Sequence, residues 1–192
     1  MIRRRSGRRR GQALVEFAVV LPVFLLILLG IVEFGFAFAH HITMEYATRE
    51  GARMGAGLAN GSDTFDCKDV DDQVVAAVQR VLTASGSQLD VSQVGQIRIY
   101  KANASGAESG PANVWTPGKG PKVDGAHLLF KQSSGNWNAC ARNNAGLGQT
   151  DSIGVSLVYG YRYVTPLGSL TGLVGTPVLT MGDRTVMALN PD

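Results

Sequence analysis

The sequence predicts an α+β protein in which a long N-terminal transmembrane and stalk helix is followed by a small antiparallel-sheet outer domain. Three observations support this class. An apolar run lies near the N-terminus, a helical pattern continues beyond it, and apolar residues alternate along the second half of the chain. The 192 residues are enough for one membrane segment and one domain of ordinary size.

The apolar run extends over residues 17–39 and contains a single ionisable side chain, Glu33. A helix rises about 1.5 Å per residue, so this run is long enough to cross a hydrocarbon core of roughly 30 Å. We therefore expect a transmembrane helix over residues 12–40, in a single-pass membrane protein.

A basic leader, residues 1–11, precedes this helix and contains six arginines but no acidic residue. Removing these six from the 18 basic residues leaves 12 against 15 acidic residues, a net charge of −3 for the remaining chain. Positive charge beside an apolar helix marks its cytoplasmic side, so the domain that follows should be extracytoplasmic. This is a simpler explanation of the arginines than binding to nucleic acid, which we do not expect.

The helical pattern continues outside the membrane over residues 41–60. Glu45 and Arg49 are four residues apart, and Glu50 and Arg53 are three apart, so each pair can form an ion pair on one helix face. The sequence at 60–62, Asn-Gly-Ser, predicts the end of the helix.

Small residues recur every fourth position on this helix, at Ala47, Gly51 and Gly55. Such a face allows close approach of a neighbouring element. We favour packing of the chain's own sheet against it, and contact with another subunit is the alternative.

The outer domain, residues 61–192, should begin with an amphipathic helix at 69–85. Its first turn contains Asp69, Asp71 and Asp72, where acidic side chains complement the helix dipole. A calcium loop would need acids at alternate positions followed by glycine, and Gln73 and Val74 do not fit that pattern. Capping of the helix is therefore the preferred interpretation.

Alternating or β-prone segments predict four strands. They lie at residues 96–101, 126–131, 153–164 and 177–189, the last with a turn or bulge at 182–183. Glycine, serine and proline predict exposed loops at 103–125 and 133–150. Tyr159, Tyr161 and Tyr163 share one face of the third strand, where a place in the core or at its rim is favoured over a binding surface.

Cys67 and Cys140 are the only cysteines. Because an exported domain matures in an oxidising compartment, we expect a disulfide between them rather than two reduced thiols. No catalytic set is recognised: the three histidines and two cysteines do not match a zinc site, and no nucleophile or phosphate-binding motif is present. The sequence therefore suggests no enzyme, no metal, no cofactor and no small-molecule substrate.

The residues between the arginines and the apolar run have a particular spacing: Gly11, then Gln12, then Glu16 as the fifth residue after the glycine. A secretory signal cleaved at residues 37–39 is a rival, but the apolar run is longer than is usual for such signals. An uncleaved signal anchor explains the arginines and the length, but it does not explain Glu16.

This arrangement resembles the cleavage site of type IV pilin precursors. The resemblance implies that a prepilin peptidase cuts after Gly11, so that Gln12 becomes the first residue and Glu16 the fifth. In pilins, the glutamate at this position is thought to attract the N-terminal amine of a neighbouring subunit during assembly.

The run Arg49-Glu50-Gly51-Ala52-Arg53, shortly after a membrane helix, resembles the TadE-like family of pseudopilins of the tight-adherence (Flp) pilus. The resemblance is good over residues 11–59 and loose over 153–189. It implies a pilin-like fold, a place in the bacterial inner membrane, and a structural role in pilus assembly. Its implied partners are the prepilin peptidase, other pilins or pseudopilins, and the assembly platform.

Two other classes of protein remain as alternatives. One is an unprocessed single-pass membrane protein whose outer domain binds a partner in the envelope. The other is a membrane-tethered hydrolase, for which the sequence offers no residue set.

Overall fold

The computed structural model describes residues 8–61, 65–146, 150–168 and 178–190. These residues form an α+β fold, a long N-terminal apolar helix and an antiparallel sheet, as the sequence predicted. The chain divides into two compact units. One contains the described residues of Met1–Phe38 and Arg162–Pro177, and the other those of Ala39–Tyr161 and Val178–Asp192.

Helix α1 extends from Arg8 to Leu58, 51 residues without a break. In the first unit its apolar side chains are largely exposed, with Leu14 at 69% and Phe34 at 72%. Among the described residues, α1 is the one helix long and apolar enough to cross a membrane. This fits a single-pass membrane protein.

The first unit also contains a turn after residue 162, and Glu33 of α1 binds it. One carboxylate oxygen accepts a hydrogen bond from Val164 N at 3.0 Å and the other from Thr165 N at 2.8 Å. Glu33 is buried in the structure, and the sequence analysis had given it no role.

The second unit contains a five-stranded sheet in the order β5-β2-β1-β6-β7. Its strands are β1 (Val94–Ala102), β2 (Glu108–Pro117), β5 (Phe130–Gly135), β6 (Ser152–Arg162) and β7 (Val178–Ala188). Antiparallel ladders join β1 to β2 and to β6, and β2 to β5. A separate two-stranded ribbon pairs β3 (Lys122–Val123) with β4 (Ala126–His127).

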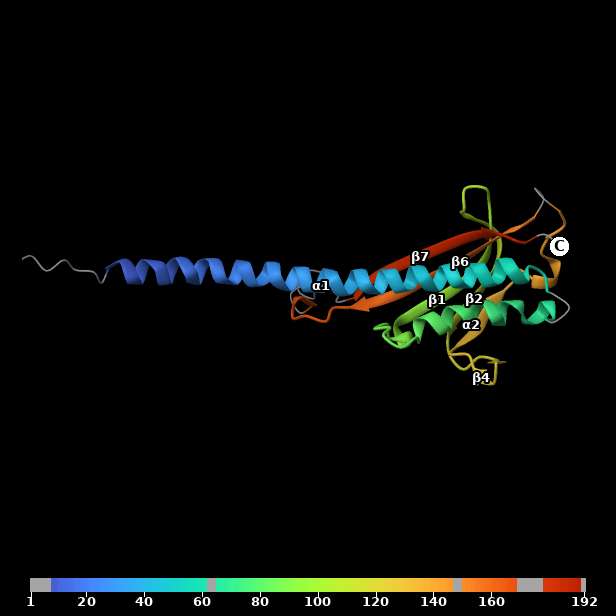
Figure 1. The fold of residues 1–192 in the computed structure, drawn as a ribbon, viewed down its shortest axis with the longest axis horizontal. Coiled ribbons are helices and arrows are strands. Elements are labelled where there is room, and N and C mark those ends of the chain that lie inside the picture. The colour runs from blue at the N-terminus through green and yellow to red at the C-terminus, as the bar shows by residue number, and fades with distance from the viewer. Residues whose placement is uncertain (1–7, 62–64, 147–149, 169–177, 191–192) are drawn as a thin grey trace, which may run out of the picture. The chain divides into compact units, whose positions relative to one another are not determined.

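Helix α2 (Val70–Leu82) lies alongside the second half of α1, and both pack on the sheet (Figure 1). The core is formed by apolar residues of these elements, among them Val74, Val78, Ile97, Ile99, Val155 and Leu157. Tyr159 and Tyr161 are buried in it, as the alternation along β6 predicted.

The small-residue face of α1 packs inside this core. Ala47 is fully buried, and a Cβ atom added at Gly51 would lie 2.6 Å from Val78 Cγ2 on α2. At Gly55 the added atom would lie 2.5 Å from Ile153 Cδ1 on β6. The prediction that the chain's own domain packs on this face is therefore confirmed.

Three sequence predictions about the outer domain were wrong. Residues 103–125 are not an exposed loop, because β2 lies there and is an inner strand of the sheet. Its Pro111 falls where the β1 ladder shifts register, a position that tolerates a missing N–H. β7 continues through residues 182–183, which excludes the turn expected there but not the bulge that was its alternative. The strand expected at 126–131 is divided between β4 and β5, and β5 extends into the loop expected at 133–150.

The acidic first turn of α2 was only partly predicted. Asp69 is at the N-cap but makes no side-chain hydrogen bond to the helix, so it does not cap it in that way. Asp71 and Asp72 lie in the first turn, where the dipole favours them, but Asp71 is also buried.

The packing around Gly51 gives a testable prediction. Gly51→Ala should lower the free energy of unfolding by about 1–3 kcal/mol, because Val78 and Val155 must move to admit the methyl group. Urea unfolding of the full chain in detergent, followed by the fluorescence of the buried Trp115 and Trp137, measures this.

The matched control is Gly57→Ala on the same helix, where an added Cβ has no atom within 4 Å. It should raise stability by about 0.5–1 kcal/mol through helix propensity alone. A Gly51→Ala protein as stable as the Gly57→Ala protein would contradict the close packing.

Candidate functional site

The residues predicted for peptidase cleavage lie on the exposed first turns of α1. An added Cβ at Gly11 would have no atom within 4 Å, so the polypeptide there is open to an approaching protein. Gln12 Nε2 donates a hydrogen bond to Glu16 Oε1 at 3.1 Å, across one helical turn. The side chains of Gln12 and Glu16 therefore lie on one face of the helix.

The run at 49–53 divides between the surface and the core. Arg49 pairs with Glu45 at 2.5 Å and Arg53 pairs with Glu50 at 2.9 Å, both on the exposed face of α1. The hydrogen bond from Arg53 is the main cause that lowers the pKa of Glu50. Gly51 and Ala52 face inward and are buried. The motif thus combines a close helix contact with a charged outer surface.

Thr48 is a residue that the sequence analysis missed. Its side chain is fully buried, and its hydroxyl contacts the Asp183 carboxylate and, at 3.1 Å, the Thr185 hydroxyl. Both partners are on β7, so Thr48 joins α1 to an edge strand of the sheet. Only the tertiary fold brings these residues together, since more than a hundred positions separate them.

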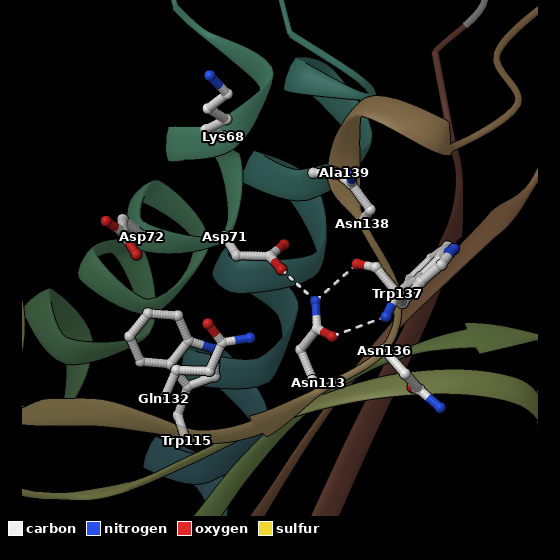
Figure 2. Close-up of a pocket in the computed structure, with 11 residues that line it drawn as sticks. Lys68, Asp71, Asp72, Asn113, Trp115, Gln132, Asn136, Trp137, Asn138 and Ala139 are labelled. Atoms are coloured by element: carbon white, nitrogen blue, oxygen red, sulfur yellow. Dashed lines mark hydrogen bonds between the residues drawn. The ribbon is translucent and has the colours of Figure 1, made fainter.

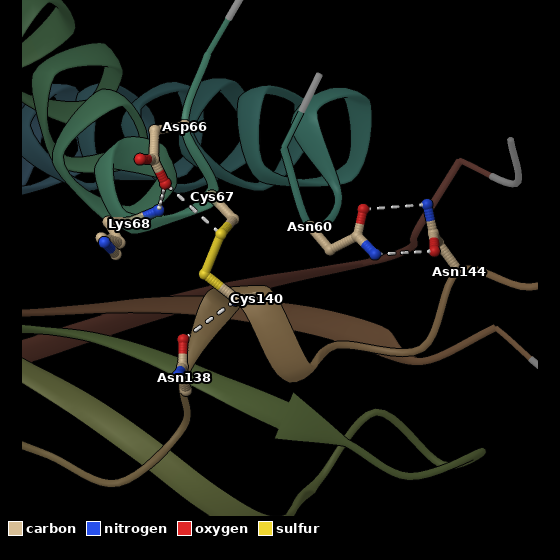
Figure 3. Close-up of a disulfide and its surroundings, with 7 residues drawn as sticks. All are labelled: Asn60, Asp66, Cys67, Lys68, Asn138, Cys140 and Asn144. Carbon is tan, nitrogen blue, oxygen red and sulfur yellow. Dashed lines mark hydrogen bonds between the residues drawn. A yellow bond between two sulfur atoms is a disulfide. The ribbon is translucent and has the colours of Figure 1, made fainter. Parts of the chain in front are cut away.

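Cys67 and Cys140 form a disulfide, with their Cα atoms 4.9 Å apart (Figure 3). Each cysteine lies in a short 3₁₀ helix, Cys67–Asp69 or Ala139–Ala141. The side chains of Asp66 and Asn138 accept hydrogen bonds at 3.0 Å from the backbone N–H groups of Lys68 and Cys140. These local caps hold the two sulfur atoms in bonding position.

Asn60 and Asn144 form a reciprocal amide pair in the same region, at 3.0 and 3.2 Å (Figure 3). Asp66, Cys67 and Cys140 are close enough to suggest metal ligands, since their ligand atoms lie within 4.8 Å of one another. Both sulfur atoms are occupied by the disulfide, so they are not available as thiolates. The region therefore serves to connect the end of α1 and the start of α2 to the long loop after β5.

A polar pocket of about 350 Å³ lies between the start of α2 and the edge of the sheet. Figure 2 shows Asn113 at its centre, with its amide between Asp71 and Trp137. Asn113 Nδ2 donates to Asp71 at 2.6 Å and to Trp137 O at 2.7 Å, and Asn113 Oδ1 accepts from Trp137 N at 2.9 Å. The residue thus fixes both a buried carboxylate and the loop backbone.

Arg142 neutralises that carboxylate. Its Nη2 lies 2.6 Å from Asp71 Oδ1, its side chain is fully buried, and its guanidinium lies 4.2 Å from the centre of the Trp137 ring. Asp72, beside this pair, has no such cation within the part of the chain that the structure describes. Burial first, and then the charges of Asp69 and Asp71, raise the pKa of Asp72 to about 6. The pocket therefore contains one paired and one unpaired carboxylate, without an assembled nucleophile and base among the described residues.

Comparison with known proteins identifies one related family. Residues 11–53 match the family model described as TadE-like protein. The TadE-like resemblance expected from the sequence is thereby confirmed over this segment, which lies entirely within helix α1. Helix α2 and the strands of the sheet lie outside the match. No curated protein and no solved structure matches the chain.

The buried ion pair gives a second prediction. Arg142→Met should lower the free energy of unfolding by about 3–5 kcal/mol, because Asp71 remains buried without its cation. Adding Asp71→Asn to this variant should recover much of the loss, since no charge is then left unpaired. A double-mutant cycle by urea unfolding measures both. Strictly additive effects of the two substitutions would show that the side chains do not interact.

Asp72 gives a prediction about pH. Its folded-state pKa of about 6 lies above the ordinary value of 3.8, so the folded protein binds more protons than the unfolded chain between these values. Ionisation of Asp72 should therefore reduce stability as the pH rises from about 4 to about 6. In Asp72→Asn this decrease should be absent, and the variant should be the more stable protein at neutral pH.

Urea midpoints for both proteins across this pH range provide the measurement. Titrating groups that do not interact with Asp72 cancel in the difference between wild type and variant. A difference in urea midpoint that is constant with pH would contradict the raised pKa of Asp72. A higher midpoint for wild type at neutral pH would contradict it as well.

Proposed function

We propose that this protein is a minor pseudopilin that prepilin peptidase processes after Gly11 and that is required for assembly of a tight-adherence (Flp) pilus. Its role is structural rather than enzymatic. The TadE-like match supports a component associated with this pilus. Processing, the assembly requirement and the particular partners are our inference from the residues within that match.

One observation carries the proposal. The matched segment begins at Gly11, the residue after which we expect cleavage, and ends at Arg53, the last residue of the Arg-Glu-Gly-Ala-Arg run. The expected cleavage site and the Arg-Glu-Gly-Ala-Arg run, which suggested a pseudopilin, therefore lie at the two ends of the matched segment. The arginines of the basic leader, all before Gly11, lie outside it, as expected for a segment that is removed.

The proposed topology is a basic leader at 1–11, a membrane helix at 12–40, its extracytoplasmic continuation at 41–60, and an extracytoplasmic α+β domain at 61–192. The exposed apolar surface of α1 and its 51-residue length support it. The arginines favour a cytoplasmic N-terminus. With this topology the disulfide between Cys67 and Cys140 lies outside the cytoplasm, in an oxidising compartment where disulfides persist.

The role proposed for Glu16 follows from helix geometry. Cleavage after Gly11 creates an amine on Gln12, whose side chain is one turn from Glu16. A carboxylate at the membrane surface attracts such an amine, and pairing lowers the cost of holding either charge near lipid. We infer that Glu16 receives the amine of an adjacent subunit during assembly, with the assembly platform and other pilins as partners.

The alternative is an unprocessed single-pass protein whose outer domain binds an envelope partner. The polar pocket around Asn113 would then be a place for such binding. This alternative keeps the leader on the mature chain and does not require Glu16.

Substitution at the cleavage site tests the proposal. Gly11→Ala should leave the precursor uncut, seen as slower migration of the membrane protein on an immunoblot. The matched control is Gly30→Ala, which also lies in α1 with no atom within 4 Å of its new Cβ and should be processed normally. Normal processing of Gly11→Ala would contradict the proposed cleavage.

Glu16→Ala separates processing from assembly in the same experiment. The variant should be cut, yet cells that contain it should lack pili by electron microscopy and should adhere poorly. Full piliation with Glu16→Ala would remove the role given to this carboxylate, even if cleavage itself proceeds.

A further inference from the structure

We propose that residues 163–168 form a lipid-facing segment that inserts into the outer leaflet of the membrane and that Glu33 holds it against the membrane helix. This inference rests on the proposed membrane span of α1. It goes further by assigning a lipid-contacting surface outside that helix, and a function to the one ionisable residue of the apolar run.

Glu33 is unusual for a membrane helix because its side chain is ionisable and yet buried, with an exposed fraction of 6%. Both carboxylate oxygens are occupied, one by Val164 N at 3.0 Å and the other by Thr165 N at 2.8 Å. Hydrogen bonds to a charged acceptor are among the stronger ones in proteins, and they compensate a carboxylate for the loss of water. The interaction fixes the backbone of the segment to one position on α1.

That position sets the depth of the segment. Glu33 lies six residues before Ala39, the last residue of the apolar run, which corresponds to about 9 Å along a helix. Segments that lie in the membrane interface are typically buried about 5–10 Å into the boundary between headgroups and acyl chains. The backbone held by Glu33 is therefore at the depth of an interfacial segment.

The hydrogen bonding within residues 164–168 suits this environment, where water is scarce and a free backbone N–H is costly. Glu33 accepts from the first two N–H groups. Leu167 N donates to Thr165 Oγ1 at 3.4 Å and Gly168 N donates to Thr165 O at 3.2 Å. Pro166 has no N–H to satisfy. Every amide donor from 164 to 168 thus has an acceptor within the segment or on Glu33.

The side chains of the segment are also those expected at a lipid surface. Val164 is 63% exposed although it is apolar. Tyr163 precedes it, and tyrosine is enriched at membrane interfaces. The sequence contains no charged residue from 163 to 182, between Arg162 and Asp183. An exposed apolar turn bound to a membrane helix is best explained by contact with lipid.

A depth measurement tests this inference on the full chain in phosphatidylcholine vesicles. Val164→Cys is labelled with an environment-sensitive fluorophore, and quenching is compared between lipids brominated near the headgroup and lipids brominated deep in the acyl chain. The two native cysteines are joined in a disulfide and do not react with the label. Shallow bromines should quench the probe at 164 more strongly than deep ones.

Two positions on α1 provide matched controls. Phe24→Cys, at an exposed residue within the apolar run, should be quenched best by deep bromines. Gly57→Cys, 18 residues beyond Ala39 and thus about 27 Å further along the helix, should not be quenched. If the probe at 24 is quenched and that at 164 is not, residues 163–168 do not insert, whereas the membrane span stands. If neither is quenched, the span itself is wrong and this inference fails with it.

Glu33→Gln tests the tether. The glutamine amide retains one acceptor oxygen, but its NH₂ group cannot accept the second backbone N–H. The variant should therefore lose more than half of the quenching at 164, while quenching of the probe at 24 is unchanged. Glu45→Gln, an exposed glutamate of the same helix, should leave both unchanged. Full quenching at 164 in Glu33→Gln would overturn the role of Glu33. Protection of the probe from aqueous iodide without lipid quenching would indicate a protein partner and overturn lipid contact.

Discussion

The close contact between the small-residue face of α1 and the core of the outer domain is the constraint on which this fold depends. Glycine at 51 and 55 lets the helix approach α2 and β6 to distances that a methyl group would not allow. Because these residues face inward, the neighbouring charged residues Arg49, Glu50 and Arg53 must face outward, where they pair along the helix. One short run of sequence thus determines both the packing and the charged surface of the stalk helix.

The same helix has two environments along its length, and that division links fold to proposed function. Its first part displays apolar side chains, and its second part is buried against a domain that a disulfide and a buried ion pair stabilise. A pseudopilin would need both properties, because its helix must insert into the bilayer and its domain must remain folded outside the cytoplasm. Thr48 and the Asn60–Asn144 pair add polar contacts that fix the domain to the second part.

Sequence patterns sufficed for the elements whose signals are local. The apolar run, the i,i+4 ion pair of Glu45 and Arg49, and the alternation along β6 each depend on residues a few positions apart. β2 was missed because its glycine and prolines resemble a loop, and its place as an inner strand depends on pairing with β1 and β5. The Arg142–Asp71 pair and the Glu33 tether join residues 71 and more than 130 positions apart, so no local pattern could predict them.

The most direct test of the account is the N-terminal sequence of the protein purified from membranes of cells with and without the prepilin peptidase. We expect Gln12 as the first residue when the peptidase is present and an uncut leader when it is absent. A chain that begins at Met1 in both strains would contradict the pseudopilin proposal and favour an uncleaved anchor. A chain that begins at His40 would show that the apolar helix is a secretory signal and is not retained.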